Sequence, residues 1–426
     1  MRGLVAAAVA GVLTVGLSGC AGDRAAARPS GSATPAAARS SARPTPVSLG
    51  KPLWRRQVSG AAPVSRRYAL DRLDTVTMSG GTLAYEGDAA AGDHLRVVVA
   101  DVRTGVSRWS RSTGDRVPGT ASATYRMGTL PPVLNRDTVF LDYGDDDGGE
   151  LGLAALSARD GHRRWSVPTG RYGAFGADVF AADERTVLLD ATTYGDDDDV
   201  RAETTIALSA RDGHELWRAP GVAPDRVVGD TVLTYRRHLP YSMDDEPPAT
   251  VVALDAHTGR RRWALGGQVT RAGADAGGAG TVVVDAAHGQ GTVLVDARSG
   301  RRLAALGGGV DNCWYDGPTA LLCDTRTGAN PTVERHSLRA IDLQPDGPAT
   351  VGRPARRMAY VPKSVAGGVV FGCGPAGPVL LDRSGRFRGT APGWFQAADG
   401  GLVLLASVED VHHDNCTLSV YRLPGR

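Results

Sequence analysis

Lysine is almost absent from this 426-residue sequence, which contains it only at Lys51 and Lys363, so nearly all positive charge is carried by arginine. The 48 basic residues face 46 acidic ones, and no basic run with interleaved aromatic residues occurs. Proteins that bind nucleic acid need a basic excess, so this balance excludes nucleic acid as an expected partner. Aromatic residues make up only 6% and glycines number 56, which is typical of a globular, turn-rich chain.

The apolar run at the N-terminus is too short to cross a bilayer. Leu4–Leu17 contains 14 residues and follows Arg2, whereas a spanning helix needs about 20. A run of this length behind a positive charge predicts an export signal over residues 1–19. The next residues, Leu-Ser-Gly-Cys ending at Cys20, resemble the lipobox of bacterial lipoproteins. The resemblance implies that Cys20 is diacylated and anchors the protein on the extracytoplasmic face of the cell membrane. Ordinary secretion, with Cys20 removed or unmodified, is the alternative.

The segment after the cysteine has no apolar periodicity. From Ala21 to about Val47 it consists mainly of Ala, Pro, Ser, Thr and Arg, a composition that cannot bury enough surface to order itself. We therefore expect three regions: a lipoprotein signal over 1–19, a lipidated cysteine with a disordered linker over 20–47, and a folded domain over 48–426.

A repeated spacing between glycine and tryptophan organises the folded domain. Its fullest copy, VALDAHTGRRRW, runs from Val252 to Trp263. Glycine permits the positive φ of a tight turn, and a tryptophan in the following strand offers a broad face to a neighbouring unit. We interpret these residues as a structural docking motif. The pairs are Gly50 with Trp54, Gly105 with Trp109, Gly161 with Trp165, Gly213 with Trp217 and Gly259 with Trp263.

The distance between repeats predicts the architecture. Successive turn glycines lie 41 to 56 residues apart at Gly105, Gly161, Gly213, Gly259 and Gly300. One four-stranded antiparallel sheet needs about that many residues, which predicts an all-β propeller. Weaker copies at Gly347 and Gly385, with half a motif at each terminus, give eight blades. Seven is the alternative if the turn near Gly347 is a loop. We expect the strand at Trp54 to complete the last blade beside a strand at Thr417–Leu423, which closes the ring.

Strands within a repeat can be predicted directly. Those of the fifth unit are expected at Val269–Ala274, Thr281–Asp285, Thr292–Asp296 and Arg302–Leu306, separated by polar or glycine-rich turns. No helix is required anywhere.

The recurring Ala, Asp or Ser, Gly and Trp positions resemble the docking motif of pyrroloquinoline-quinone (PQQ)-type eight-bladed propellers. Ala253, Asp255, Thr258, Gly259 and Trp263 match it fully, whereas other copies depart from it. The best-known members are quinoprotein dehydrogenases, which hold the quinone with calcium beneath a disulfide of adjacent cysteines. No two cysteines are adjacent here, so neither PQQ nor an enzymatic activity is expected. The chain is more similar to the non-catalytic branch, such as the propeller lipoprotein of the β-barrel assembly machinery, although its composition resembles that of actinobacterial proteins.

Four cysteines remain after Cys20, an even number in an exported chain, which favours disulfides. A hairpin around Asp316-Gly317 is expected to bring Cys313 and Cys323 together. That pairing leaves Cys373 with Cys416, joining two neighbouring blades near the ring closure. Buried, unpaired thiols are the alternative.

Acidic residues concentrate in loops that blade topology places on one face, opposite the glycine–tryptophan turns. The candidate interaction residues are Asp145, Asp146, Asp147, Asp196, Asp197, Asp198, Asp199, Asp244, Asp245 and Glu246. Such residues also form turns and solvated surface. The functional interpretation is a negatively charged face for a basic protein segment or another cationic ligand of the cell envelope. Calcium is a further alternative, although no D-x-D-x-D-G loop with its distal glutamate occurs.

Two functional hypotheses follow from these patterns. The first is a membrane-anchored, monomeric scaffold without catalytic residues or cofactor, which binds a partner through the acidic loop face. The second is an extracytoplasmic enzyme, quinone-dependent or acting on carbohydrate, with its site at the mouth of the propeller. Neither an esterase nucleophile elbow nor a zinc-protease motif or phosphate-binding loop is present in the sequence.

Overall fold

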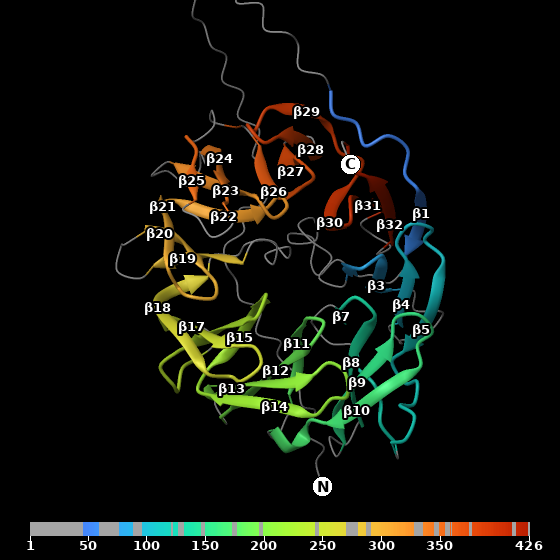
Figure 1. Ribbon diagram of the computed structural model, residues 1–426. Coiled ribbons are helices and arrows are strands. Elements are labelled where there is room, and N and C mark those ends of the chain that lie inside the picture. Colours follow the sequence, from blue (N-terminus) through green and yellow to red (C-terminus); the bar gives the residue numbers. More distant parts are fainter. Residues whose placement is uncertain are drawn as a thin grey trace, which may run out of the picture.

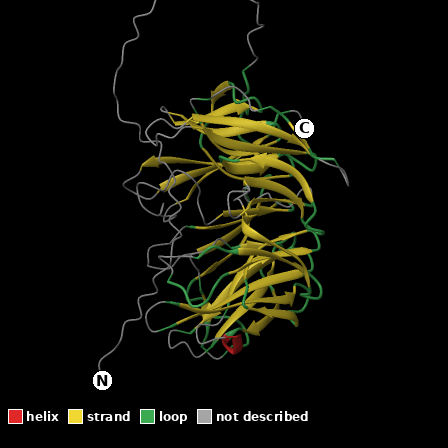
Figure 2. Cartoon of the chain, turned by 90° about the vertical axis from the view of Figure 1, so that its left-hand side faces the viewer, coloured by secondary structure: helices red, strands yellow, loops and turns green. Residues whose placement is uncertain are grey.

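The computed structural model of the chain is a ring of β-sheets arranged as blades around a central axis (Figure 1). It describes residues 46–424 apart from 59–75, 88–95, 121, 127–131, 146–149, 173–176, 196–198, 243–246, 270–279, 287–290, 328–334, 345–348, 354–357, 359, 375–376 and 411–414. The predicted signal, Cys20 and nearly all of the linker lie outside the described residues. Apart from η1 (Gly170–Tyr172), a single 3-10 turn, the described elements are strands (Figure 2).

The middle strands of a blade are apolar along their length because the neighbouring blades cover both of its faces. In β9 (Leu151–Ser157) the five central residues are all buried. A sheet with one exposed face would instead alternate between buried and exposed positions. The perimeter strand β10 (Arg163–Pro168) differs, because it exposes Arg163 and Arg164 while it buries Trp165.

Blades 1 to 3 are separate antiparallel sheets. Blade 1 contains β2 (Val76–Ser79), β3 (Thr82–Glu86), β4 (Arg96–Asp101) and β5 (Ser107–Ser112). In blade 2, the short strands β6 (Thr124–Tyr125) and β7 (Val133–Leu134) both pair with β8 (Thr138–Gly144), which is followed by β9 and β10. Blade 3 contains β11 (Asp178–Ala182), β12 (Thr186–Tyr194), β13 (Val200–Ser209) and β14 (Glu215–Pro220).

Blades 4 and 5 share one strand and so form a continuous seven-stranded sheet. Its strands are β15 (Ala223–Val228), β16 (Thr231–Arg236), β17 (Thr250–Asp255), β18 (Arg261–Val269), β19 (Thr281–Ala286), β20 (Gly291–Asp296) and β21 (Arg302–Gly307). The first part of β18 pairs with β17, and from Gly267 onward it pairs with β19.

This shared strand corrects the prediction for blade 5. The expected first strand, Val269–Ala274, starts too late, since β18 already pairs with β19 from Gly267, and residues 270–274 lie outside the described part. The outer strand of blade 4 continues into blade 5 without a turn, and its change of partner strand falls at Gly266-Gly267. The other three predicted strands correspond to β19, β20 and β21.

Blades 6 to 8 complete the ring. Blade 6 contains β22 (Val310–Tyr315), β23 (Ala320–Thr327), β24 (Arg335–Asp342) and β25 (Thr350–Val351). Blade 7 contains β26 (Val361–Ala366), β27 (Val369–Gly374), β28 (Gly377–Asp382) and β29 (Phe387–Thr390). Blade 8 contains β30 (Trp394–Asp399), β31 (Leu402–Asp410), β32 (Asn415–Arg422) and, from the other end of the chain, β1 (Trp54–Val58). The predicted eight-bladed all-β propeller is therefore confirmed.

The N-terminal strand closes the ring, as predicted. In the outermost position of blade 8, Trp54 pairs with Val420 and Val58 with Cys416. One face of this sheet packs on blade 1 in a shared apolar cluster that includes Leu418, Val420 and Tyr85. Pairing of the two chain ends leaves β32 without an open edge.

Each tryptophan of the docking motif lies against the turn glycine of the next blade. A Cβ atom added to Gly259 would stand 2.7 Å from the Trp217 ring, and one added to Gly105 would stand 2.6 Å from the Trp54 ring. The φ of Gly259 is +65°, in the left-handed region that favours glycine. The indole Nε1 of Trp217 also donates to the carbonyl oxygen of Ala256 at 2.8 Å. The motif therefore joins consecutive blades through a ring contact and a hydrogen bond.

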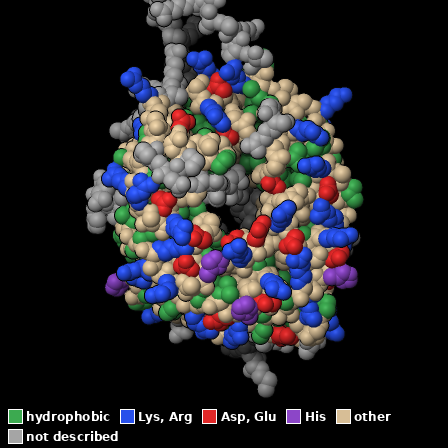
Figure 3. All heavy atoms as spheres, viewed as in Figure 1, with side chains coloured by type: hydrophobic (Ala, Val, Ile, Leu, Met, Phe, Trp, Pro, Cys, Tyr) green, Lys and Arg blue, Asp and Glu red, His purple; other side chains and the backbone are tan. Residues whose placement is uncertain are grey.

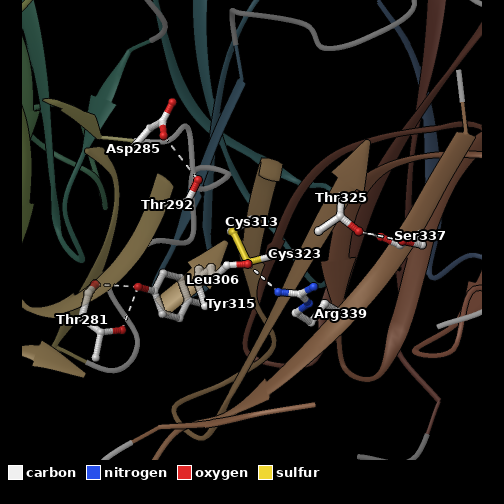
Figure 4. The surroundings of a disulfide bond; sticks show 10 residues. All are labelled: Thr281, Asp285, Thr292, Leu306, Cys313, Tyr315, Cys323, Thr325, Ser337 and Arg339. Atoms are coloured by element: carbon white, nitrogen blue, oxygen red, sulfur yellow. Dashed lines mark hydrogen bonds between the residues drawn. A yellow bond between two sulfur atoms is a disulfide. The ribbon is translucent and has the colours of Figure 1, made fainter. Parts of the chain in front are cut away.

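The cysteines support one predicted disulfide and correct the other. Cys313 and Cys323 form a disulfide between directly paired positions of β22 and β23 (Figure 4). The predicted bridge between Cys373 and Cys416 is not formed. Alternation along β32 turns Cys416 toward blade 1, with Leu418 and Val420, whereas Tyr421 faces blade 7. Cys416 thus lies on the side of blade 8 that faces away from β27. Side chains alternate between the two sides of a strand, and the sequence argument did not take into account which side Cys416 occupies.

Candidate functional site

The two faces of the propeller have different chemical character. We define the turn face as the one formed by the glycine–tryptophan turns, residues 101–107, 157–163, 209–215, 255–261 and 296–302. The loop face is the opposite one, where β8 leads into β9, β12 into β13 and β16 into β17. Figure 2 shows the ring edge-on, with the two faces on opposite sides. The predicted acidic segments follow β8, β12 and β16 in the sequence, and the structure describes only the ends of these segments.

Only two of the ten predicted interaction residues are described, Asp145 and Asp199; the other eight lie outside the described residues. Both are near arginines. The backbone carbonyl of Asp145 accepts a hydrogen bond from Arg126 at 2.8 Å, and the Asp199 carboxylate lies 3.5 Å from Arg201. Basic residues therefore offset part of the acidic charge at the base of these loops.

Four carboxylates lie within the strands of blades 2 and 3, where the sequence reasoning did not place a site. They are Asp142 in β8, Asp178 in β11, Asp190 in β12 and Glu203 in β13. Asp178 and Asp190 are directly paired across β11 and β12. A single acidic residue inside an otherwise apolar strand is the signal that could have identified them.

Glu203 is the most buried member of this carboxylate cluster, with a side chain only 2% exposed. Its Oε1 accepts hydrogen bonds from Arg237 Nη1 at 3.0 Å and from the Tyr241 hydroxyl at 2.8 Å. Its Oε2 has no hydrogen-bond partner in the described part of the chain. The Arg237 guanidinium stacks near the rings of Tyr235 and Tyr241. Glu203 is thus held as one side of a buried ion pair with spare acceptor capacity.

Burial and mutual repulsion raise the pKa values of three members of this cluster. Burial, reinforced by the charge of Asp178, raises the pKa of Asp142 to about 8. Burial also raises the pKa of Asp190 to about 6, against a hydrogen bond from Thr192 that lowers it. Desolvation by the surrounding protein raises the pKa of Asp178, while the charge of Arg126 lowers it. Asp142 and Asp190 can therefore exchange protons near neutral pH, and a neighbouring cation would favour their ionised forms.

A second acidic group of the same kind lies in blade 1. Glu86 is the last residue of β3, on the loop-face side, and burial raises its pKa to about 7. Carboxyl groups with raised pKa values therefore occur under the loops of blades 1 to 3.

The residues present do not fit a quinone site of the dehydrogenase type. The disulfide Cys313–Cys323 connects non-adjacent cysteines buried among apolar side chains of blades 5 and 6. No group of three or more His, Cys, Asp or Glu residues that could hold a metal ion occurs among the described residues. Most acidic loop residues lie outside that part, so calcium binding there stays a hypothesis.

Comparison with known proteins adds one family match. Residues 149–308, from the start of β9 to just after β21, match the sequence model of a PQQ-type repeat family described as outer membrane protein assembly factor BamB. This region covers the end of blade 2 and blades 3 to 5. No curated protein sequence matches the chain significantly. The molecule is thus an eight-bladed propeller, and residues 149–308 of it are similar to the PQQ-type repeat family.

Solved structures with similar folds have low sequence identity to this chain. BamB from Moraxella catarrhalis is 14% identical, with a TM-score of 0.43 over 82% of this chain and 96% of its own. A quinohemoprotein alcohol dehydrogenase from Pseudomonas putida HK5 is also 14% identical, with a TM-score of 0.32 over 82% of this chain and 66% of its own. A eukaryotic initiation factor is 9% identical, with a TM-score of 0.44 over 82% and 84%. Such distant likenesses carry no functional argument.

None of the described helical residues forms a segment long and apolar enough to cross a bilayer.

Proposed function

We propose that this protein is a non-catalytic binding scaffold, held on the outer side of the cell membrane by a lipid on Cys20, which captures a cationic partner on its loop face. One observation carries the proposal. Carboxylates gather inside blades 2 and 3, at Asp142, Asp178, Asp190 and Glu203, and the sequence continues from β8 and β12 into aspartate-rich segments. A cationic protein segment or envelope polymer would be attracted by both groups of acids.

The family match gives independent support. It covers residues 149–308, which include the carboxylates of blade 3 and the acidic loops of blades 3 and 4. The matched family is described as an assembly factor, a role based on contacts between proteins. For this chain that role is a proposal, and the partner is defined by its positive charge rather than by a name.

The test is capture from intact cells by crosslinking, followed by mass spectrometry of the retained proteins. The variant Asp197→Asn/Asp198→Asn neutralises two charges on the loop face. The matched control, Asp160→Asn/Asp212→Asn, removes two exposed charges from the turn face. We expect partner recovery to fall severalfold in the first variant and to persist in the second, and to weaken at high salt. Equal recovery from both variants would contradict the proposal.

A second candidate function has one specific observation in its favour. Asp142 and Asp190, with pKa values of about 8 and 6, could donate and accept protons in a hydrolytic reaction on carbohydrate. Turnover of an oligosaccharide by the purified protein, lost in Asp190→Asn with unchanged thermal unfolding, would favour this enzyme over the scaffold.

A further inference from the structure

The turn face carries arginines that the fold does not use. Arg260 and Arg261 follow the turn glycine of blade 4, and Arg301 and Arg302 follow that of blade 5. All four side chains are exposed, and none forms an ion pair or a side-chain hydrogen bond within the described part of the chain. Arginine side chains that neither pack nor pair do not stabilise the blade, so their charge is available to a partner.

The docking motif brings these arginines together. Trp263 of blade 4 packs on Gly300 of blade 5, and its Nε1 donates to the Ala297 carbonyl oxygen at 2.8 Å. The two arginine-bearing turns are therefore fixed beside each other. Figure 3 shows Lys and Arg side chains all round this face of the ring, including the left side, where Figure 1 places β17 to β21. We call Arg260, Arg261, Arg301 and Arg302 the arginine patch.

The acids of the same two turns form no ion pair with the arginine patch in the described part of the chain, because their oxygens bond within the turns. Asp255 Oδ1 accepts from the backbone N–H of Thr258 at 2.9 Å, while its Oδ2 accepts from Arg262 at 2.6 Å. Asp296 Oδ1 accepts from the backbone N–H and the hydroxyl of Ser299 at 2.7 and 2.6 Å. Both carboxylates are thus occupied within their turns.

The corresponding turns of blades 2 and 3 have a different charge balance. There the exposed Arg159 and Arg211 are each followed directly by an exposed aspartate, Asp160 and Asp212. In blade 3 the carboxylate of Glu215 also pairs with Arg218 at 2.8 Å. Blade 2 also exposes Arg163 after its turn glycine, but this side chain donates to the Pro118 carbonyl oxygen. Among the described turns of blades 2 to 5, it is therefore blades 4 and 5 that expose arginines with neither an acidic neighbour in sequence nor a side-chain hydrogen bond.

The chain that precedes the propeller enters on the turn face. Gly50 occupies the turn position of the docking motif, with φ of +71°, and β1 begins four residues later at Trp54. The C-terminal end of β32 meets the same face, where the N–H of Leu423 donates to the Gly401 carbonyl oxygen at 2.9 Å. The first described residues therefore lead into β1 at the face that carries the arginine patch, after the Val47 N–H has donated to the Arg388 carbonyl oxygen at 3.2 Å.

We infer that the arginine patch docks the turn face onto anionic phospholipid headgroups and points the acidic loop face away from the membrane. The guanidinium group matches phosphate oxygens in a bidentate geometry, and anionic membrane surfaces attract clustered basic residues. The 25 residues between Cys20 and Pro46 could span up to roughly 85 Å, so a tether alone would not set the orientation. This inference rests on the lipid anchor in the proposed function.

The test uses the full, lipidated chain in vesicles that contain a photoactivatable phospholipid. One set is pure phosphatidylcholine, and the other contains about 30% phosphatidylglycerol. We expect labelling of residues 255–263 and 296–304 to be at least about fivefold greater in the anionic vesicles, and this difference to vanish at high salt. Arg260→Gln/Arg261→Gln/Arg301→Gln/Arg302→Gln should abolish the difference.

The matched control removes four exposed arginines from turns of blades 1 to 3 on the same face, with Arg103→Gln, Arg159→Gln, Arg185→Gln and Arg211→Gln. It should retain most of the difference. Equal loss in both variants, labelling independent of anionic lipid, or labelling of the loop face would overturn the inference. So would binding of a soluble phosphodiester polymer without binding of anionic vesicles. Two further measurements distinguish this failure from failure of the proposed function. The mass of the Cys20 peptide shows whether the lipid anchor is present, and partner capture by the loop-face variants shows whether the protein acts as a scaffold.

Discussion

Blades 8 and 1 to 5 are joined in one way, and blades 6 and 7 in another. In the first group a tryptophan packs on the next turn glycine at each junction, as Trp263 does on Gly300. At the end of blade 5 the motif position holds Ala304, and in blade 6 Met358 occupies the place beside Gly385. The same ring geometry is therefore built with two sets of contacts.

Polar contacts between blades replace the missing tryptophans. Tyr315 of blade 6 donates to the Thr281 carbonyl oxygen of blade 5 at 2.5 Å, near the disulfide (Figure 4). The buried Asp316 carboxylate accepts from Arg383 Nε of blade 7 at 2.7 Å and from the Gly368 N–H at 3.0 Å. A propeller thus requires a filled junction between blades, but not a particular residue in it.

The largest effect is expected from emptying a regular junction. Trp217→Ala removes a ring that is 8% exposed and its hydrogen bond to Ala256, which should cost about 3–5 kcal/mol of unfolding free energy. Met358→Ala, its counterpart in the irregular region, should cost about 2 kcal/mol because less surface is removed. Urea unfolding measures both. If the methionine variant lost as much stability as the tryptophan variant, the two junction types would be energetically equivalent.

Breaking the disulfide tests whether blade 6 depends on its covalent link. Cys313→Ala/Cys323→Ala should lower the unfolding free energy by about 3 kcal/mol, since the bridge closes a chain separation of 10 residues in the unfolded state. A reductant should destabilise the native protein by a similar amount and leave the variant unaffected. If the urea midpoint of the variant were unchanged, the disulfide would contribute nothing measurable and packing alone would stabilise blade 6.

Two glycines with the same backbone conformation separate turn strain from ring contact. Gly259→Ala adds a Cβ 2.7 Å from the Trp217 ring at φ +65°, and we expect a loss of about 2 kcal/mol. Gly50→Ala, at φ +71° with nothing within 4 Å of the new atom, should lose about 1 kcal/mol from strain alone. Thermal unfolding of the pair gives the difference. If both variants lost the same unfolding free energy, contact with the Trp217 ring would not contribute to the effect of Gly259→Ala.

The smallest effect concerns buried acids, which also differ between the two regions. In blade 6 Asp324 has His336 as a partner at 2.6 Å, whereas Asp142 Oδ1 of blade 2 has none among the described residues. An unfolded aspartate ionises near pH 4, but folded Asp142 keeps its proton up to a pKa of about 8. Between these values the unfolded state binds fewer protons, so stability should fall as pH rises and level off above pH 8.

Urea midpoints at pH 5, 6.5 and 8 test this dependence. Asp142→Asn cannot ionise, so the stability of the native protein relative to this variant should fall by about 1 kcal/mol or more from pH 5 to pH 8. Asp101→Asn is a control with another pH window: burial raises the pKa of Asp101, but hydrogen bonds from Arg108 and Thr104 outweigh this and lower it. Because the pKa of Asp101 is lowered in the folded state, its contribution to the unfolding free energy is lost only as the pH falls into the acidic range. Parallel curves for native protein and Asp142→Asn would refute the raised pKa.

Much of the fold could be predicted because its signals are local. A glycine followed four residues later by tryptophan specifies a turn, a strand and a contact surface, and its repetition gives the ring. The half-motif at Trp54 likewise predicted the closing strand, which pairs with Val420. Prediction failed at two places where the local signal is missing. One is β18, which passes between blades without a turn. The other is Met358, which lies outside the motif but occupies the place of a tryptophan.

The candidate site was harder to predict because it depends on which side chains share an interior. Eight of the ten residues predicted for the acidic face lie outside the described residues, so that face stays a prediction. Asp142, Asp178 and Glu203 lie in different strands and meet only when blades 2 and 3 pack. The bridge between Cys373 and Cys416 was wrong for the same reason, since one step along β32 changes the side of the blade.

The sequence alone determined the repeat, the turns and the order of the blades, because each depends on residues within a few positions of one another. Only the tertiary structure decided the environment of each charge: which carboxylates are buried and keep their protons, which acids are tied into turns, and which arginines are left unpaired. Those properties follow from solvent exclusion and from neighbours in other strands and blades, which distance along the chain does not encode.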